Sequence, residues 1–432
     1  MAPPKGGFAP GLDKFLDTLK GRPLESSVDF LVSLLKRRQI KGSEDCAIAT
    51  AHILLQVVAR DKWTNIDQLI IRIRSVGSQL VTAQPREIVI GNIVRRVLGL
   101  IRDEALEDRN DPGSDSISDL NEVTPPSPVR AADPGDYSLV GRLIRTPALN
   151  LLGGSFSRTQ SMFQLLSDPD HVPPGSPQFG SGSSTPLVNA QNANVYAFRT
   201  EIIEGIEEIM DEIKQVDEQV QAYSDIIIHP GDYILIHQPT RTVQKFLTKA
   251  ASKRRFTVFL TVDPTQASAE EDSYASFRKS VTSHGSVVVN IMNTGLLAYM
   301  TRVNKVILSA RAITGKGEVV VDSGAAVIAR AARELGRTVI VLGGVYKLSP
   351  DSHELETLVE WGDPSKHVNF SDGAMVGHVK VKNAVSEFIP AEFVDTYLTN
   401  LGAHSRDHLH GIINDHYKEE DINFNLAGKI ER

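Results

Sequence analysis

From residue 232 onward, short apolar and β-branched runs alternate with stretches of helical periodicity, and this alternation constrains the fold more than any other feature. The expected strands are YILIH (233–237), FTVFLTV (256–262), VVVNIM (287–292), KVILSA (305–310) and TVIVLGG (338–344). Helices are expected between them over 241–252, 270–283, 293–303 and 323–336. Strands that are apolar along their whole length are buried on both faces, and helical connections make them parallel. The sequence therefore predicts a Rossmann-like parallel α/β domain over residues 224–425.

The first hundred residues carry a different pattern. Apolar residues recur every three or four positions, as in AIATAHILLQVV (47–58), which is the periodicity of a helix. We expect an all-helical N-terminal domain over residues 11–102. Ser26-Ser27 can cap a helix that enters VDFLVSLLKRR, and Gly42-Ser43 can end that helix and help to start the next. The chain has 432 residues, which is more than a single hydrophobic core usually serves. We therefore expect two folded units.

Residues 103–195 have the composition of a linker or insertion. Between 103 and 136 there are ten acidic and two basic residues, and residues 103–194 contain eleven of the 22 prolines. Such a segment buries too little apolar surface to offset its ordering entropy, although LVGRLIRTPALNLLGG within it is apolar enough to dock. Its function stays open between an inert spacer and a segment with its own activity.

A connecting amphipathic helix is predicted over residues 200–223. Its apolar positions, spaced alternately by four and three residues, form one seam: Ile202, Ile206, Ile209, Ile213, Val216 and Val220. Acidic residues, Asp217 among them, occupy much of the remaining surface. That surface is interpreted first as a solvated face and second as a surface for a partner.

Composition excludes several classes of protein. The formal net charge is −7, which does not favour a general nucleic-acid binder. Cys46 is the single cysteine, so neither an internal disulfide nor a thiolate metal cluster is expected, and we interpret it as a small core residue. No run has the apolar length of a membrane span or a secretory signal, and a cytosolic protein is expected.

Loops after the strands are where an open parallel sheet binds ligands. They contain HQPTRT, TVDPTQ, MNTG, SARAITGKGE and GGVYK, with neither a dinucleotide GxGxxG nor a phosphate-binding GxxxxGK[ST] fingerprint. No cofactor is therefore expected, and the glycines are interpreted first as turn residues. Thr240, Asn293 or Ser323 can cap a helix there and present backbone amides to an anion.

Two other clusters of side chains deserve weighing. His404, His408 and His410 include a helical i, i+4 pair, but without accompanying acidic or cysteine ligands we expect ordinary exposed histidines and no metal. Arginines gather in the helical domain, and guanidinium groups on a rigid scaffold suit acidic or phosphorylated protein partners. Solvated helix faces are the alternative. The candidate partner-binding residues are Arg72, Arg74, Arg86, Arg95 and Arg96.

Three stretches carry a family resemblance. KWTNIDQLIIRIRSVGSQLVTAQPREIVIGNIVRRVLGLIRDE, VNKVILSARAITGKGEV with VIVLGGVYKLSP, and SEFIPAEFVDTYLTNLGAHSRDHLHGIINDHYKEEDI resemble the regulatory subunits (alpha, beta, delta) of the guanine-nucleotide exchange factor for eukaryotic translation initiation factor two. The first and last stretches favour the beta type. The resemblance spans nearly everything except the linker.

This family is similar in fold to methylthioribose-phosphate and ribose-bisphosphate isomerases, which transfer a proton with a cysteine and an aspartate. The resemblance places Arg311 where those enzymes have the aspartate, in SARAI, and the third-strand region VVVNIMNTG contains no cysteine. Arginine cannot act as the acid or base of a proton shuttle. Asn293, Thr294, Arg311 and Asp322 are the candidate residues of a vestigial pocket, and no catalytic residue is expected.

What the resemblance implies is a non-catalytic regulatory subunit. It would pair with the delta paralogue, join the alpha, gamma and epsilon subunits, hold the alpha subunit of the initiation factor and sense its phosphorylation. The alternative is a sugar-phosphate aldose-ketose isomerase with displaced catalytic groups, in which Asp322 or His237 would be the base. A third interpretation is a pseudo-isomerase that binds a phosphorylated metabolite.

Overall fold

The computed structural model describes residues 11–110, 186–262, 274–350, 360–363, 368, 373 and 380–422. Met1–Asp108 and Thr185–Arg432 together form one compact unit, in which the helical and α/β regions are both included. The loop after the second predicted strand and most of the acidic linker lie outside the described residues, so the expectations for them, like the division into domains, stay predictions.

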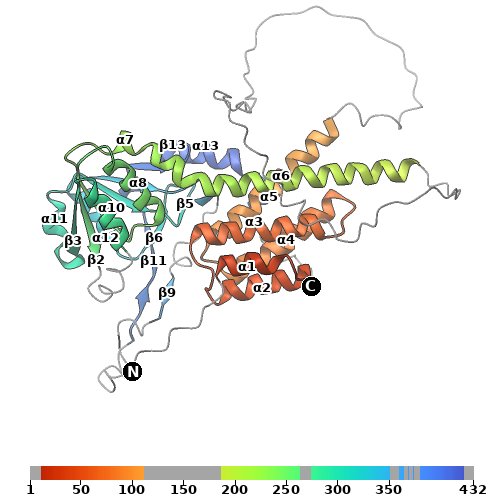
Figure 1. Cartoon of the computed structure of the whole chain (residues 1–432), viewed down its shortest axis with the longest axis horizontal. Helices are drawn as coiled ribbons and strands as arrows, with labels where there is room; N and C mark the ends of the chain where they lie inside the picture. The colour runs from red at the N-terminus through yellow and green to blue at the C-terminus, as the bar shows by residue number, and fades with distance from the viewer. Residues whose placement is uncertain are drawn as a thin grey trace, which may run out of the picture. The chain divides into compact units, whose positions relative to one another are not determined.

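Five helices make up the N-terminal region: α1 Leu12–Leu19, α2 Leu24–Lys36, α3 Ser43–Arg60, α4 Ile66–Ala83 and α5 Ile88–Asn110 (Figure 1). Nearly every residue of α3 is buried, because α1, α2, α4 and the later helix α6 pack around it. The expected cap at Ser26-Ser27 is wrong. Pro23 precedes α2 and fixes its entry, so both serines lie within the helix, where the Ser27 hydroxyl donates to the carbonyl of Pro23. Gly42 does precede α3, with a φ of +90° that favours glycine.

Helix α6, Pro186–Ala222, links the two regions and is longer than expected, since it begins fourteen residues before position 200. All six residues of the predicted seam are buried, which confirms the amphipathic pattern. The helix packs against α3 on the helical side and against α8 on the α/β side. Asp217 was assigned to the solvated face but is buried. It accepts a hydrogen bond from Thr242 and pairs with Lys245, which compensates its charge.

A seven-stranded sheet forms the α/β region, in the order β13-β12-β7-β4-β1-β2-β3. The five predicted strands are confirmed as β1 Tyr233–His237, β2 Thr257–Val262, β3 Val287–Met292, β4 Lys305–Ser309 and β7 Thr338–Leu342, all parallel to their neighbours in this set. Two strands were not predicted: β12 Thr396–Thr399, parallel to β7, and β13 Gly402–His404, antiparallel to β12. The direction of strand addition reverses between β1 and β4, which makes this the switch point of the sheet.

Helices of the α/β region are α7 Ser224–Ile227, α8 Arg241–Ala251, α10 Ala275–Ser283, α11 Leu296–Met300, α12 Ala325–Glu334 and α13 Arg406–His416. The four that were expected between strands are present, although the third is short and follows a 3-10 turn, Asn293–Gly295. Helix α8 packs against α10, and α11 packs against α12. Reversal of the strand order at the switch point places these two pairs on opposite faces of the sheet.

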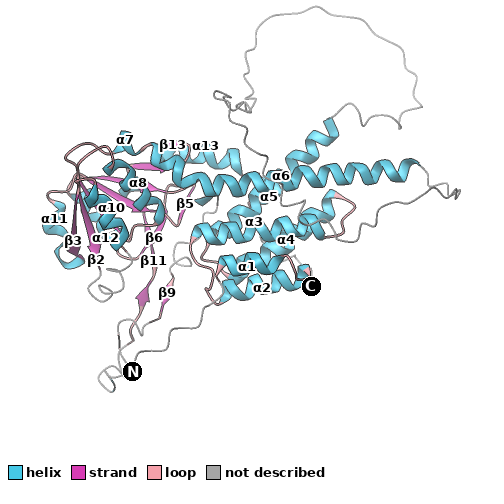
Figure 2. Ribbon diagram, in the orientation of Figure 1, coloured by secondary structure: helices cyan, strands magenta, loops and turns pink. Residues whose placement is uncertain are grey.

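A second, four-stranded sheet was missed by the sequence analysis (Figure 2). Its order is β11-β6-β5-β8, with the bounds β5 Ala312–Thr314, β6 Val319–Asp322, β8 Leu348–Ser349 and β11 Ser386–Ile389. A short antiparallel pair, β9 Trp361–Gly362 and β10 Asn383–Ala384, lies between β8 and β11 in the sequence. These strands grow out of the loops that follow β4 and β7, so they build the wall of the site described next.

Candidate functional site

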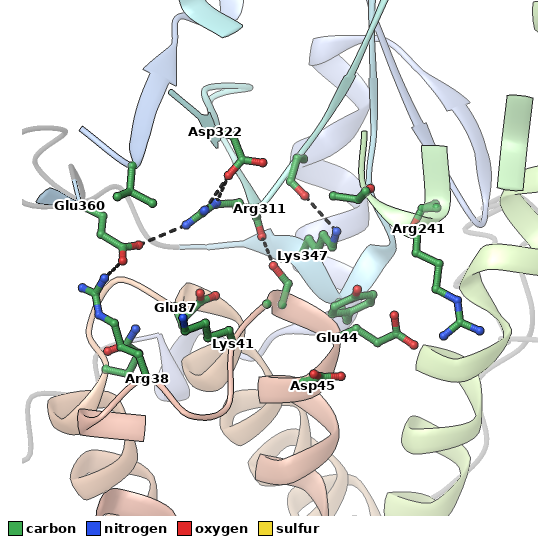
Figure 3. Close-up of a pocket in the computed structure, with 18 of the residues that line it drawn as sticks. Arg38, Lys41, Glu44, Asp45, Glu87, Arg241, Arg311, Asp322, Lys347 and Glu360 are labelled. Carbon is green, nitrogen blue, oxygen red and sulfur yellow. Dashed lines mark hydrogen bonds and ion pairs between the residues drawn. The ribbon is translucent and has the colours of Figure 1, made fainter. Parts of the chain in front are cut away.

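A cleft of about 580 Å³ lies at the carboxyl ends of β1 and β4 (Figure 3). Thr240 and Arg241 line it from the start of α8, and Ala310 and Arg311 line it from the segment after β4. The opposite wall comes from the helical region, through the segment between α2 and α3 and the residue that precedes α5. The switch point of a parallel sheet is where such folds bind ligands, so this cleft is the candidate functional site.

Arg311 lies at the centre of an ion-pair chain in this cleft. Its Nε and Nη2 both donate to Oδ1 of Asp322 at 2.6 Å, and its Nη1 lies 3.2 Å from Oε2 of Glu360. The other oxygen of Glu360 pairs with Arg38 from the helical region, as Figure 3 shows. Asp322, Arg311, Glu360 and Arg38 thus form one continuous chain of alternating charge. The sequence predicted Arg311 and Asp322 for this pocket and missed the other two residues.

The helical region also contacts the backbone of this centre. Ser43, the first residue of α3, donates a hydrogen bond from Oγ to the carbonyl of Arg311 at 3.1 Å. Lys347, which follows β7, is 6% exposed and donates from Nζ to the carbonyl of Ala310 at 2.9 Å. Burial lowers the pKa of Lys347, while the nearby carboxylates of Asp217 and Glu44 oppose that shift. Both side chains hold the segment after β4 in place.

Three carboxyl groups on the helical wall of the cleft are partly shielded from water. Burial raises the pKa of Glu44, Asp45 and Glu87, and neighbouring acidic side chains raise it further. The cations Arg311 and Lys347 oppose the shift at Glu87. Acidic and basic side chains therefore share the cleft, which is not a site of one charge sign.

Backbone strain is concentrated beside the cleft. In the described residues, the two non-glycine positions with positive φ are Arg38, at +54°, and Gln238, at +39° in the loop after β1. Arg38 ends α2 with the two hydrogen bonds of a Schellman motif, from its own amide to Leu35 and from the next amide to Leu34. Glycine is the usual residue at that position, and Arg38 adopts this conformation while its side chain pairs with Glu360.

His237, an alternative base, is engaged on both ring nitrogens. Nε2 lies 2.7 Å from the carbonyl of Ser323, which only accepts, so this nitrogen carries a proton. Nδ1 lies 2.6 Å from Oγ1 of Thr261. The ring is 5% exposed and is not part of the cleft lining. Asp322, the other alternative base, lines the cleft but is bound by Arg311.

Asn293 and Thr294 are not brought together with Arg311, which corrects the expectation of a shared pocket. They follow β3, the edge strand of the sheet, and are exposed outside the cleft lining. The sequence grouped them because both loops follow strands, but the strand order separates β3 from β4 by two strands. Of the predicted capping residues, Thr240 does precede α8, whereas Met292 and Gly324 take the positions expected for Asn293 and Ser323.

Four of the five candidate partner-binding arginines make contacts within the chain. Arg72 pairs with Glu25 and Asp61, and Arg96 pairs with Glu212 of α6 at 2.6 Å. Arg74 binds Asp421 at 2.6 Å, and Arg95 donates to the carbonyl of Ile422 at 3.0 Å. Arg95 is 4% exposed, so its predicted place on a partner surface does not fit its burial.

Arg86, the fifth, lies near Arg38. Burial lowers the pKa of Arg38, and the like charge of Arg86 lowers it further. Arg86 is partly exposed and forms no ion pair with any residue that the structure describes.

The remaining motifs have structural positions. Cys46 is fully buried and burial raises its pKa, as expected of a core thiol. His408 and His410 are exposed on α13, while His404 ends β13 and contacts Thr399. Within the described ranges, no three His, Cys, Asp or Glu side chains converge as a metal site requires. The same part of the chain contains no helix with the length and apolar character needed to cross a bilayer.

The fold and the cleft define a class of protein: a Rossmann-like α/β region joined to a helical N-terminal region, with ion pairs inside the cleft at the switch point. The sequence pattern described as the initiation factor 2 subunit family (IF-2B) matches residues 39–405. The chain belongs to this family, which confirms the resemblance drawn from its motifs.

Individual relatives agree with the beta type. The chain is 33% identical to translation initiation factor eIF2B subunit beta of Schizosaccharomyces pombe, over 91% of this chain and 96% of that protein. The crystal structure of eIF2B beta from Chaetomium thermophilum is similar with a TM-score of 0.69 and 39% identity, covering 96% of this chain and 99% of that one. In the tetrameric eIF2B-beta2-delta2 complex of the same organism, a chain matches with a TM-score of 0.63 and 36% identity, over 93% of this chain and 98% of that chain.

A distant similarity connects the chain to an enzyme. Ribose 1,5-bisphosphate isomerase of Pyrococcus furiosus is 24% identical over 218 residues, which are 50% of this chain and 66% of that protein. This similarity agrees with the expected kinship between the regulatory subunits and the isomerases.

Proposed function

We propose that this chain is a non-catalytic regulatory subunit, of the beta type, in the exchange factor that reactivates translation initiation factor two. It pairs directly with a delta-type subunit and joins alpha-, gamma- and epsilon-type subunits in the cytosol. Its similarity to eIF2B beta over nearly its full length, and to a chain of a beta2-delta2 complex, supports this assignment.

The observation that carries the non-catalytic role is the state of the cleft. An aldose-ketose isomerase needs an acid or base free to reach the substrate. Arg311 occupies the centre of the cleft and cannot transfer a proton at neutral pH, and it binds the carboxylate of Asp322 through two donors. The ring of His237 is held by Thr261 and Ser323. Neither alternative base is available, so the cleft serves to hold the chain together.

We also propose that the helical region binds the alpha subunit of the initiation factor and senses its phosphorylation. A guanidinium that is not already paired is suited to a phosphoserine, because it can donate two parallel hydrogen bonds. Arg86 is the best of the five candidates, since the other four have partners inside the chain.

The test of subunit identity is co-expression of the full chain with the delta-type subunit of the same organism, followed by size exclusion with light scattering. We expect a stable complex, and we expect nucleotide exchange on the initiation factor to require the catalytic-type subunits. A chain that stays monomeric beside every other subunit would refute the proposal. For phosphorylation sensing, R86Q in the assembled complex should reduce inhibition by the phosphorylated factor, whereas R72Q serves as the control.

Isomerase activity is the competing function and has a direct assay. The purified chain and its D322N variant are incubated with ribose 1,5-bisphosphate or methylthioribose 1-phosphate in a coupled assay. We expect no saturable turnover from either. Turnover by the unmodified chain that D322N abolishes would establish an enzyme instead.

A further inference from the structure

Two arginines from separate segments pair with one carboxylate at the cleft, and a third arginine lies near one of them. Arg38 ends α2, Arg86 precedes α5 and Arg311 follows β4, and the side chain of Glu360 lies between Arg38 and Arg311. The Glu360 side chain is 8% exposed, so the carboxylate is almost fully removed from water. A carboxylate in this position is stable because it has two guanidinium partners.

The backbone indicates that Arg38 is held for this contact. Its φ of +54° costs an arginine free energy that a glycine would not lose, and the Schellman motif needs no side chain at that position. A residue in a sparsely populated conformation persists when its surroundings compensate the strain. The ion pair between Arg38 and Glu360 supplies such compensation.

Glu360 itself is held in place from the other side. Its amide donates to Oγ of Ser386 at 3.0 Å, and its carbonyl accepts from the amide of Val385 at 2.7 Å. These contacts attach Glu360 to the segment that leads into β11, so its carboxylate is delivered to the cleft by the α/β region. Arg38 comes from the helical region, and the contact therefore joins the two.

The geometry is that of an anion site with the anion already present. Two guanidinium groups converge on the two oxygens of one carboxylate, which is the arrangement by which arginines bind phosphate or carboxylate ligands. We propose that Glu360 is an internal ligand. Arg38 and Arg311 form a binding site for an oxyanion, and the carboxylate of Glu360 occupies this site. It thereby closes this part of the cleft to phosphorylated ligands from solution.

The consequence is that this subunit joins its helical and α/β regions without a metabolite. A tethered carboxylate has a high effective concentration at this binding site, so a free anion competes poorly with it. Removal of the carboxylate would leave Arg38 and Arg311 facing each other, with Arg86 close by. Asp322 would still pair with Arg311, and the Glu87 carboxylate would offset part of the charge of both cations. A dianion such as phosphate is then the natural replacement, because like charges that are only partly exposed to water raise the free energy of the folded chain until a counter-charge binds.

The test uses the full-length chain and inorganic phosphate as the probe, with thermal unfolding and isothermal titration calorimetry as the measurements. In E360Q, the amide keeps the volume of the side chain but removes its charge. Phosphate at about ten times its Kd should raise the Tm of E360Q by roughly 2 °C, and calorimetry should show one saturable site. The unmodified chain and the control E334Q, an exposed glutamate on α12, should show no such site.

Two further variants keep the test decisive. R38Q/E360Q removes one cation together with the carboxylate and should lose the phosphate response of E360Q. E360D retains a charge and should fold even if E360Q is insoluble, and its shorter side chain should allow weak phosphate binding. Phosphate binding by the unmodified chain as tight as by E360Q would overturn the proposal, as would the absence of binding by both E360Q and E360D. Neither result depends on whether the chain pairs with a delta-type subunit.

Discussion

Asp421 attaches the C-terminal segment to the helical region, and the effect of its replacement on the free energy of unfolding can be predicted. Its carboxylate is fully buried and accepts hydrogen bonds from Arg74 at 2.6 Å and from Nε and Nη2 of Arg102 at 2.9 and 3.2 Å. The two arginines belong to α4 and α5, more than 300 positions earlier in the sequence. The D421N substitution keeps the size of the side chain but removes the charge that both guanidinium groups require.

The magnitude follows from burial and exposure. Breaking a fully buried ion pair costs roughly 3–5 kcal/mol, because one charge is left without compensation. Here the carboxylate is the buried partner and is itself neutralised, while the arginine side chains are 24% and 25% exposed and can be partly rehydrated. The asparagine also directs one amide donor at a cationic donor. We expect D421N to lower the free energy of unfolding by about 2–3 kcal/mol.

The assay is urea denaturation, combined with hydrogen exchange at the amides of residues 417–422. E420Q is the matched control: the Glu420 side chain is 71% exposed and pairs with the same Arg102, so its loss should cost less than about 1 kcal/mol. We expect faster exchange of the Asp421 and Ile422 amides in D421N only. Equal effects of the two substitutions would show that burial of Asp421 does not determine the strength of this contact.

Three other perturbations have defined outcomes. G324A should lower the free energy of unfolding by about 2–4 kcal/mol in urea denaturation, because φ at this position is +101° and the new Cβ would lie 2.9 Å from Nε2 of His237. G336A is the control: its φ is +61°, no atom lies near the new Cβ, and the substitution should cost about 1 kcal/mol. Burial lowers the pKa of His52 from 6.5 to about 4, so the unfolded state binds a proton at this residue before the folded state does as pH falls. The free energy of unfolding should therefore drop by up to about 3 kcal/mol between pH 6.5 and 4. In H52Q, unfolding measured over the same pH range should lack this drop. Burial raises the pKa of Glu87, so the stabilisation from its protonated form is present at low pH and is lost as pH rises through the folded-state pKa. E87Q should therefore be more stable than the unmodified chain at pH 7. Below pH 4.5 the same denaturation series should show no gain.

The parallel strands were predictable because their signal is local. β1, β2, β3, β4 and β7 are each a short run rich in apolar or β-branched residues, which is typical of strands in a parallel sheet. The central strands are largely buried, whereas β3 lies at the edge of the sheet and is mostly exposed or half-buried. The buried face of α6 was equally predictable, because the apolar residues on one face of a long helix recur with the same spacing many times.

The second sheet escaped prediction because its strands are short and carry little pattern. β5 has three residues and β8 has two, and glycines at 315 and 317 separate β5 from β6. The sequence pattern of that stretch predicts a single loop after β4. β5 pairs with β8, and β6 pairs with β11, which lies about 65 residues further along the chain. No local periodicity in the sequence indicates pairings between segments so far apart.

The arginines illustrate a second limit. Basic residues on helices are expected to face solvent or a partner. The sequence around Arg74 and Arg95 does not indicate that their side chains contact another part of the same chain. Their actual contacts are residues 420–422, at the other end of the chain. A surface that looks available in the isolated helical region is thus occupied by the C-terminal segment. Arg96 is likewise occupied by α6, and the charge that remains for a partner is smaller than the sequence suggests.

The charge of the residue that follows β4 determines which side chains gather in the candidate site. An aspartate after β4 would leave a free carboxylate at the switch point, where it could accept a proton from a bound ligand. Arg311 at that position attracts carboxylates, and it has gathered Asp322 and Glu360 around itself. Once Glu360 is there, Arg38 gains a buried partner, and the helical region is joined to the α/β region through charge. The same cation therefore binds the carboxylates of the cleft and, through Glu360, connects the helical region to the α/β region.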